Sequence, residues 1–306
     1  MRIVSLIASA TEILHALGLG RSQVGRSHEC DYPPEVHSLP VCTRPRFSIE
    51  GSSRDIDQRV KRTLADASSV YEVFDDVLDQ LRPTHVLTQS QCRVCAVSID
   101  DVERALQTRF DWRPSVVALE PNSLADVWQD IRRVAVACGV DEKGESLVRE
   151  LTSRMGDIAR AAGGLTRPRF VCLEWQEPLM AAGNWAPELI AMAGAENLFG
   201  EAGRHSPWMQ WDDLVRADPD AILVSPCGYD IAKTAAEMYW LEQRPEWQGL
   251  KAVGEGRVYL ADGNQYFHRP GPRLADSLRI LAEILHPDAF PPSHLGSGWV
   301  KFVGGS

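Results

Sequence analysis

The middle of the chain carries a long amphipathic pattern that constrains the fold more than any other stretch. Over residues 141–163, apolar side chains recur at three- and four-residue spacing, at Leu147, Leu151, Met155, Ile158 and Ala162. Charged residues fill many of the remaining positions, which is typical of an amphipathic helix of roughly six turns. On either side of it, short apolar runs alternate with helical patterns. The pattern therefore predicts a helix that joins two α/β lobes; the alternative is one more crossover helix in a single large sheet.

The two flanking regions predict lobes with mainly parallel central sheets. In the first region, predicted strands alternate with predicted helices, and the strands cover residues 2–8, 23–27, 84–88 and 115–119. One of the helices is predicted over residues 69–81. In the second region, strands are predicted over residues 169–174, 221–225 and 257–260. Strands separated by helices are typical of a parallel, helix-covered sheet, so the predicted fold class is α/β.

The pattern divides the chain into four predicted segments. They are an N-terminal α/β lobe over residues 1–140, a connecting helix over 141–163, a C-terminal α/β lobe over 164–290 and a loosely packed tail over 291–306. A chain of 306 residues exceeds the size at which one hydrophobic core usually keeps growing, which agrees with two lobes. The tail is predicted to be loose because it contains several prolines and glycines.

The composition excludes some partners. A hydrophobic fraction of 44% and a charged fraction of 24% are those of an ordinary globular protein. A net charge of −10 argues against a nucleic-acid partner, since phosphate binding needs a clustered basic surface. No run reaches the ~18 apolar residues that span a bilayer, and no cleavage site follows the apolar N-terminal stretch. The sequence therefore predicts no membrane insertion and a cytoplasmic location as encoded, or a periplasmic one if a leader has been removed.

Several landmarks of the chain resemble those of a known protein family. Its first 36 residues contain a strand, a helix start of the form small-Thr-Glu, Val24-Gly25 and the run DYPP. Later landmarks are the runs GAENLF at residues 194–199, ADPDAI at 217–222 and RPGPR at 269–273. Over about residues 1–287 the chain resembles the periplasmic substrate-binding proteins of vitamin B12 and iron–siderophore ABC importers, and it is closest to the cobalamin binders.

The resemblance implies a fold and a function. It implies two α/β lobes joined by one long helix, with a ligand cleft between the lobes. It also implies a non-catalytic protein that binds cobalamin or a related metal chelate as a small-molecule ligand, with an ABC transporter permease as partner. Family members normally carry a secretory or lipoprotein signal and this sequence shows none, so a cytoplasmic relative of these proteins is also consistent with it.

Cysteines gather in the loops that follow predicted strands. His28 and Cys30 follow the strand at 23–27, Cys42 ends the next extended piece, and Cys92 and Cys95 follow the strand at 84–88. Since ligands in open α/β sheets bind at the carboxyl ends of the strands, these side chains are expected on one rim. They could hold zinc or an iron–sulfur cluster, form a redox-active disulfide, or be small loop residues without chemistry. The alternative function is therefore a cytoplasmic metalloprotein or redox enzyme with a cysteine-ligated metal in the cleft.

A corrinoid would use the same rim in a different way. Its large, flat macrocycle with amide arms needs aromatic faces and a few polar anchors. The aromatic candidates are Tyr32, Phe47, Trp175, Trp208, Tyr229 and Phe267. His268 or His28 could approach cobalt as an axial imidazole.

Arginines and carboxylates complete the set of candidate residues. Arg44, Arg46 and Arg93 could hold carboxylates or phosphates on the rim. By the resemblance, Arg273 in the RPGPR turn lies near the ligand. Glu174 ends a predicted strand and could act as an acid or base, but the sequence contains no G-x-S-x-G, H-E-x-x-H or P-loop pattern and no Ser-His-Asp arrangement. The sequence therefore gives catalysis little support.

Overall fold

The protein has two compact units of mixed α/β content. The computed structural model describes residues 1–66, 69–90, 102 and 112–304. Unit 1 contains Met1–Gly51, Asp55–Pro121 and Ala125–Glu150, and unit 2 contains Ser52–Arg54, Asn122–Leu124 and Leu151–Ser306. The lobe boundaries predicted from the sequence stay a prediction.

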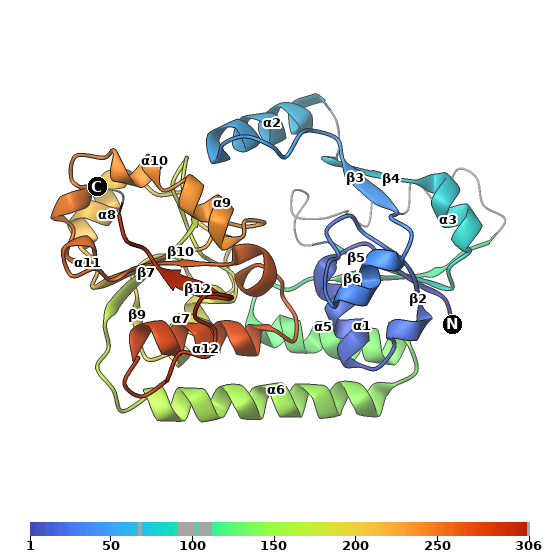
Figure 1. The fold of residues 1–306 in the computed structure, drawn as a ribbon. Helices are drawn as coiled ribbons and strands as arrows, with labels where there is room; N and C mark the ends of the chain where they lie inside the picture. Colours follow the sequence, from blue (N-terminus) through green and yellow to red (C-terminus); the bar gives the residue numbers. More distant parts are fainter. Residues whose placement is uncertain (67–68, 91–101, 103–111, 305–306) are drawn as a thin grey trace. The chain divides into compact units, whose positions relative to one another are not determined.

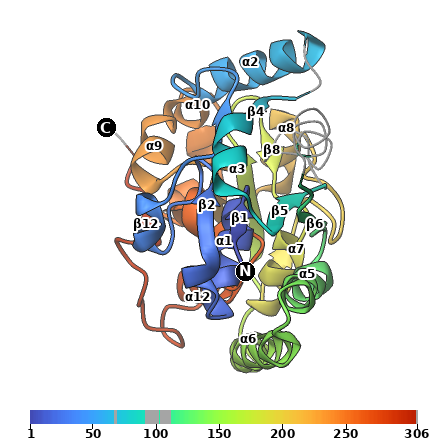
Figure 2. The same cartoon turned by 90° about the vertical axis from the view of Figure 1, so that its right-hand side faces the viewer.

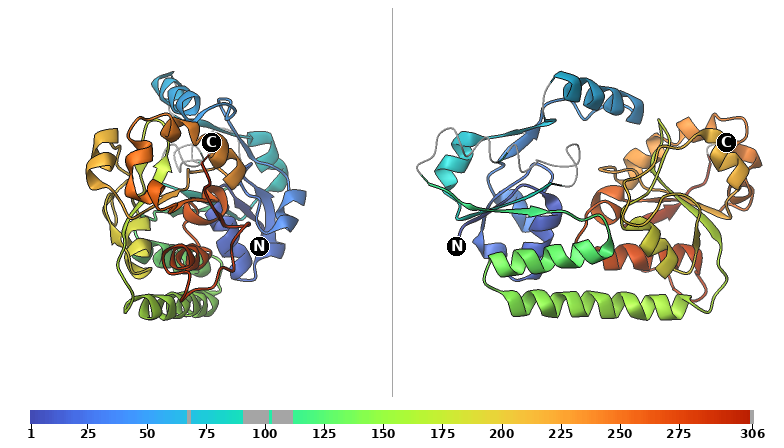
Figure 3. Two further views of the ribbon diagram at one scale, coloured as in Figure 1. Left: turned by 60° about the vertical axis from the view of Figure 1, so that its left-hand side comes forward. Right: turned by 180° about the vertical axis from the view of Figure 1, so that it is seen from behind.

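The long helix predicted in the middle of the chain is present as α6 (Asp141–Ala162). It runs without a break in Figures 1 and 3. Its apolar side chains at Leu151, Met155 and Ile158 are buried, as their spacing predicts. The residues of α6 through Glu150 belong to unit 1 and the rest belong to unit 2, so this one helix is a covalent connection between the units.

Unit 1 is built on a parallel sheet of β1 (Ile3–Ser5), β2 (Gln23–Arg26), β5 (His85–Gln89) and β6 (Ser115–Leu119). The strand order is β2-β1-β5-β6, and every neighbouring pair is parallel (Figure 2). Its helices include α1 (Ala8–Ala16), α3 (Asp75–Leu81) and α5 (Leu124–Ala137). Val4 of β1, Val86 of β5 and Leu78 of α3 are fully buried in one cluster, which fixes α3 against the sheet. The predicted parallel, helix-covered arrangement is confirmed for this unit.

An antiparallel ribbon of β3 (Thr43–Pro45) and β4 (Tyr71–Val73) forms a second, two-stranded sheet in unit 1, and α2 (Ser53–Asp66) lies between its strands in the sequence. The helix predicted over residues 69–81 is therefore wrong in its first part, because only the last seven residues form α3. Tyr71 pairs with Pro45 across the ribbon and packs in the same buried cluster as the sheet. Cross-strand pairing and burial thus outweigh the local helical spacing.

Unit 2 is built on β7 (Arg169–Trp175), β10 (Ala221–Val224) and β11 (Val258–Ala261), which are parallel to one another. β12 (Trp299–Lys301) and β8 (Met180–Ala181) pair antiparallel at the two edges, and β9 (Glu196–Asn197) pairs parallel with β7. The sheet is therefore mainly parallel, as predicted.

Helices cover each face of the unit 2 sheet because its strands are apolar on both sides. Val171 of β7 and Ile222 of β10 belong to a buried cluster that also takes residues from α8 (Trp211–Ala217), α10 (Tyr239–Glu242) and α11 (Lys251–Gly254). These helices therefore cover one face. On the other face, α7 (Ala186–Met192) and α12 (Leu274–Leu285) pack against each other (Figure 1). α9 (Ile231–Ala236) follows the carboxyl end of β10.

Part of the C-terminal tail packs on unit 2, which differs from the prediction that residues 291–306 are loose. β12 pairs with β11 along the edge of the sheet, and Trp299 is buried. Glu283 of α12, only 1% exposed, accepts hydrogen bonds from Ser293, His294 and Trp299. A buried carboxylate therefore holds a segment whose prolines and glycines indicate looseness in the sequence.

Candidate functional site

The carboxyl ends of the parallel strands present polar side chains in each unit. In unit 2, the first residues after β7, β10 and β11 are Gln176, Ser225 and Asp262. In unit 1, Ser27 follows β2 and Ser90 follows β5. Because ligands of open parallel sheets bind at this edge, each of the two edges is a candidate binding surface.

Two aromatic rings lie together at this edge of unit 2. Trp175, the last residue of β7, is tilted against Tyr229, with ring centroids 5.2 Å apart. The Lys233 ammonium of α9 lies 4.0 Å from the centroid of the Tyr229 ring, a cation–π contact. Burial raises the pKa of the Tyr229 phenol, so its hydroxyl stays protonated at neutral pH. Two of the predicted ligand contacts are thus neighbours.

Several buried polar atoms at this edge have no hydrogen-bond partner within the described part of the chain. They are Trp175 Nε1, Gln176 Oε1, Ser225 Oγ and the Tyr229 hydroxyl, here called the strand-end cluster. The Gln176 amide is fixed in place, because its Nε2 donates to the Thr234 carbonyl at 3.2 Å. An unpaired buried polar group costs about 1–3 kcal/mol, and most are paired. The strand-end cluster therefore lacks partners that ordered water could supply, or that a ligand could supply by displacing the side chains that cover these atoms.

His268 is held by the protein on its Nε2 side. Nε2 lies 2.6 Å from the Ser225 carbonyl oxygen, which can only accept, so Nε2 carries the proton. Nδ1 lies 3.8 Å from Glu174 Oε2, and the Ser206 hydroxyl donates to that same oxygen at 2.6 Å. Only Nδ1 remains for a metal, and it faces a carboxylate that is already shared. This geometry disfavours the predicted axial role of His268.

The other predicted contacts of unit 2 lie in different environments. Phe267 is 3% exposed, and its carbonyl accepts a hydrogen bond from Trp185 Nε1 at 2.9 Å, so it has the environment of a core residue. Arg273 is buried and donates to Gln265 Oε1 at 3.1 Å. Trp208 is 55% exposed. The ligand contacts of Phe267, Arg273 and Trp208 stay predictions.

His28 is the main polar group at the carboxyl end of β2 in unit 1. Its ring packs on Tyr71 with centroids 5.5 Å apart, and its Nδ1 lies 2.8 Å from Thr43 Oγ1. Its Nε2 lies 3.9 Å from the Glu29 carboxylate. Burial lowers the pKa of His28 to about 4, and the charge of Arg26 acts in the same direction. The imidazole is therefore neutral at pH 7, which is the form that binds metals.

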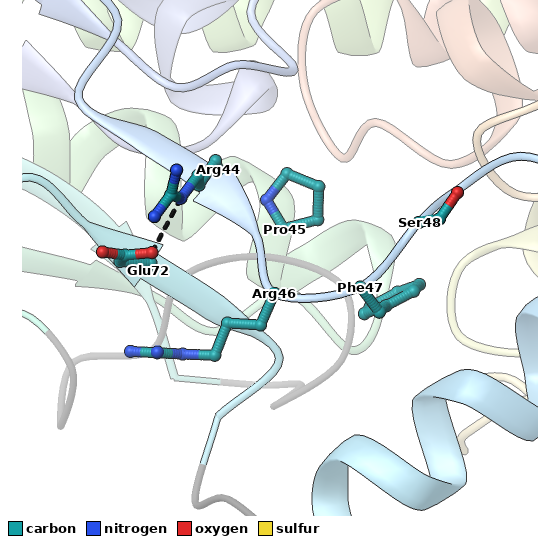
Figure 4. Close-up of a pocket in the computed structure, with 6 residues that line it drawn as sticks. All are labelled: Arg44, Pro45, Arg46, Phe47, Ser48 and Glu72. Carbon is teal, nitrogen blue, oxygen red and sulfur yellow. Dashed lines mark hydrogen bonds and ion pairs between the residues drawn. The ribbon is translucent and has the colours of Figure 1, made fainter.

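An open pocket of about 370 Å³ lies beside the β3–β4 ribbon, and its lining residues, here called the arginine pocket, are Arg44, Pro45, Arg46, Phe47, Ser48 and Glu72. Arg44 Nε donates to Glu72 Oε2 at 2.7 Å, and Arg46 Nε donates to the Tyr71 carbonyl at 2.8 Å. Figure 4 shows the two guanidinium groups on either side of Glu72, while Phe47 and Ser48 point the other way. The pocket thus brings together the predicted contact Phe47 and two of the three predicted anion-binding arginines.

Two further predictions concern Tyr32 and Arg93. Tyr32 is 42% exposed, so its ring is accessible. Arg93 lies outside the described residues. Their contacts with a ligand stay predictions.

The predicted cysteine site gets no support from the described residues. Cys30 is fully buried, and its Sγ accepts a hydrogen bond from the Thr11 hydroxyl at 3.1 Å. Burial raises the pKa of the Cys42 thiol to about 12, so it does not supply a thiolate at neutral pH. Cys92 and Cys95 lie outside the described residues. Among the residues that are described, no group of three His, Cys, Asp or Glu side chains is placed to hold a metal ion.

Sequence reasoning missed Gln176, Ser225 and Lys233. The first two directly follow buried apolar strands, so a polar residue at the first position after a strand was the signal that could have found them. Lys233 had no such signal, because its position over the Tyr229 ring depends on how α9 packs.

A protein-family model described as periplasmic binding protein matches residues 3–264. The chain belongs to the periplasmic binding protein family. The family that the sequence landmarks resemble is therefore confirmed. The α/β fold of the two units is that of a periplasmic binding protein.

Two relatives of this periplasmic binding protein have descriptive names. It is 26% identical over 297 residues to an uncharacterized ABC transporter substrate-binding lipoprotein of Bacillus subtilis, covering 94% of this chain and 81% of that one. It is 23% identical over 280 residues to the vitamin B12-binding protein of Pectobacterium atrosepticum, covering 89% of this chain and 84% of that one.

Solved structures share the fold. The periplasmic heme-binding protein RhuT from Roseiflexus, in apo form, matches with a TM-score of 0.68 at 24% identity, covering 94% of this chain and 98% of that one. The periplasmic vitamin B12-binding protein BtuF of Vibrio cholerae matches with a TM-score of 0.65 at 18% identity, covering 95% and 98%. At these identities the likeness shows the fold alone.

Proposed function

We propose that this periplasmic binding protein captures cobalamin or a related metal chelate, without catalysis, and passes it to the permease of an ABC importer. The observation that carries the proposal is the strand-end cluster, where unpartnered polar atoms lie beside the Trp175 and Tyr229 rings. Aromatic faces with a few fixed polar groups are what a flat macrocycle with polar arms requires. The names of the relatives, which include vitamin B12-binding proteins and a heme-binding protein, support a metal chelate as the ligand class.

Cobalamin fits the strand-end cluster because amide arms both donate and accept hydrogen bonds. Trp175 Nε1 can only donate, Gln176 Oε1 can only accept, and the Tyr229 hydroxyl can do either. A carboxylate arm would find its acceptor oxygens opposed by Gln176 Oε1. The mixture of donors and acceptors therefore favours amide arms over carboxylate arms on this edge of unit 2.

For the metal of the chelate, we propose His28 rather than His268 as the axial ligand. The His28 imidazole is neutral at pH 7 and its Nδ1 is held by Thr43, which orients Nε2. In His268, by contrast, Nε2 is bound to the Ser225 carbonyl. A His28→Ala variant is expected to bind the chelate with a shifted absorption spectrum, whereas His268→Ala should leave the metal bands in place.

The proposal of a non-catalytic role rests on the geometry around Glu174. Ser206 donates its hydroxyl proton to Glu174 rather than to His268. A serine nucleophile needs a hydrogen bond to its base, and here that bond goes to a carboxylate that also faces the imidazole. These three residues therefore form a structural contact instead of an activated nucleophile.

The place of action is part of the proposal. The family is described as periplasmic and the Bacillus relative is named a lipoprotein, which supports capture outside the cytoplasm. No helix in the described residues is long and apolar enough to span a bilayer. The cytoplasmic location predicted from the sequence stays a prediction, and cell fractionation would test it.

The test is an absorption titration of the purified protein with cyanocobalamin and, separately, with haem, together with metal analysis of the protein as purified. Saturable binding of either chelate at one site per chain, with no loss of binding after chelator treatment, supports the proposal. No spectral change with either compound, or stoichiometric zinc or non-haem iron in the protein as purified, would overturn it.

A further inference from the structure

The arginine pocket is a positively charged place on an acidic chain. The whole chain carries a net charge of −10, yet the pocket holds two guanidinium groups and one carboxylate. The hydrogen bond from Arg44 lowers the pKa of Glu72, and the charges of Arg44 and Arg46 act in the same direction. Both arginines therefore lie close enough to act on one carboxylate, and the three groups together carry one surplus positive charge.

The terminal guanidinium nitrogens of these arginines are available. Arg44 uses its Nε for Glu72 and Arg46 uses its Nε for the Tyr71 carbonyl. No hydrogen bond or ion pair engages the Nη atoms of either arginine within the described residues. A guanidinium held at Nε presents its Nη donors in a fixed direction, and such donors suit phosphate and carboxylate oxygens.

Contacts within unit 1 hold the residues around the pocket in place. Arg44 stacks over the Phe74 ring at 5.5 Å, and Pro45 pairs with Tyr71 in the ribbon. Arg59 of α2 donates to the Ser48 carbonyl at 3.0 Å, which holds the loop that follows the pocket arginines. A site that is already ordered avoids part of the entropy cost of binding.

We propose that Arg44 and Arg46 form an oxyanion site that holds the phosphate or carboxylate group of the bound chelate. This inference rests on the proposed function. The arginine pocket belongs to unit 1 and would take the anionic group of the chelate. The phosphodiester of cobalamin and the propionates of haem are the two sources of such a group.

The first experiment compares each chelate with a twin that lacks the anionic group. Cyanocobalamin is paired with dicyanocobinamide, which lacks the phosphodiester, and haem is paired with its dimethyl ester. The variant is Arg44→Gln/Arg46→Gln, and the matched control is Arg62→Gln, an exposed arginine on α2. The double variant is expected to bind the anionic chelate about tenfold more weakly or worse, and the neutral twin within about twofold of wild type.

The pattern across the two pairs identifies the source of the anion. A selective loss in the cobalamin pair indicates phosphate, and one in the haem pair indicates carboxylate. An equal loss for the anionic chelate and its twin would overturn the oxyanion site, because the arginines would then only shape the loop. No loss for any ligand, or the same loss in the Arg62→Gln control, would overturn it as well.

A second experiment separates this inference from the proposed function, since it needs no chelate and no variant. Wild-type protein is treated with phenylglyoxal, with and without inorganic phosphate, and the modified arginines are identified by peptide mass spectrometry. Phosphate is expected to slow the modification of Arg44 and Arg46 but not that of Arg62. If wild type binds neither chelate but this protection is seen, the proposed function fails and the oxyanion site stands. Equal rates with and without phosphate would overturn the site.

Discussion

Unit 2 contains two clusters of buried polar residues. They differ in how many of their polar atoms have hydrogen-bond partners. The first, here called the tail cluster, surrounds Glu283 of α12 and consists of Arg279, Glu283, Ser293, His294 and Trp299. Each oxygen of Glu283 accepts at least two hydrogen bonds, and the donors include Arg279 Nε at 3.0 Å and Trp299 Nε1 at 2.9 Å. The second is the strand-end cluster, in which four buried polar atoms have no partner within the described residues.

This difference in hydrogen bonding indicates a structural role for the tail cluster and a binding role for the strand-end cluster. A fully satisfied network adds to stability, whereas an unpartnered buried atom subtracts from it. The tail cluster fastens a proline-rich segment to a helix, so its bonds are needed in the folded protein itself. The strand-end cluster lies at the carboxyl ends of β7 and β10, where a ligand can supply the missing partners. Variants of the first should therefore lose stability, and variants of the second should lose affinity.

The largest effect is expected from Glu283→Ala. It leaves the buried donors of the tail cluster without an acceptor, so the free energy of unfolding should fall by about 3 kcal/mol or more. Urea unfolding followed by tryptophan fluorescence measures this loss of unfolding free energy. The control is Glu201→Ala, at an exposed position, and its unfolding free energy is expected within about 0.5 kcal/mol of wild type. A loss below about 1 kcal/mol for Glu283→Ala would show that the tail cluster is not structural.

The stability that Glu283 contributes to the tail cluster should depend on pH. Burial alone would raise the pKa of Glu283, but the hydrogen bonds from Ser293, Trp299, His294 and Arg279 lower it to about 2. Because the folded pKa is below the unfolded value, the stabilisation is complete above pH ~4.5 and is lost as the pH falls towards 2. The stability gap between wild type and Glu283→Gln should therefore shrink by about 3 kcal/mol across that window. A gap that stays constant with pH would contradict this assignment.

A matched pair of serines gives the next test. Ser206 is 4% exposed, donates to Glu174 and accepts from the Gly183 N–H at 3.0 Å; Ser225 is fully buried and its hydroxyl has no partner within the described chain. Ser206→Ala should lower the free energy of unfolding by about 2 kcal/mol, since it removes a hydrogen-bond partner from the Glu174 carboxylate and from the Gly183 N–H. Ser225→Ala should change it by less than about 0.5 kcal/mol. Equal losses in chemical denaturation would erase the distinction between paired and unpaired hydroxyls.

The sequence predicted the frame of the fold because the frame depends on local patterns. The apolar spacing of α6 and the short apolar runs of β7 and β10 each mark an element without help from the rest of the chain. β4 and β12 were missed because each depends on a partner strand far away in the sequence, β3 and β11 respectively. Such pairing leaves no periodic signal in a three-residue strand.

The candidate site was predictable only in part, for a related reason. Trp175 and Tyr229 were two of the aromatic candidates from the sequence, and the structure brings them together. Whether a polar atom has a hydrogen-bond partner depends on the exact rotamers of neighbouring side chains. The unpaired oxygens of Gln176 and Ser225 therefore could not be predicted from the sequence. His28 and His268 looked equivalent as axial ligands in the sequence, and they are distinguished by their contacts: His28 Nδ1 lies beside Thr43 Oγ1, whereas His268 Nε2 lies beside the Ser225 carbonyl.

The sharpest test of the strand-end cluster is expected from Tyr229→Phe. The hydroxyl it removes has no partner in the described structure, so the free energy of unfolding should stay the same or rise by up to about 1 kcal/mol. Affinity for the chelate should fall severalfold, as expected for one lost hydrogen bond of about 1 kcal/mol. The matched control is Tyr259→Phe, whose ring packs on Trp299 of β12, with centroids 5.7 Å apart. Calorimetric titration and urea unfolding of both variants decide the matter: a stability loss at Tyr229 with unchanged affinity would make the strand-end cluster structural, like the tail cluster.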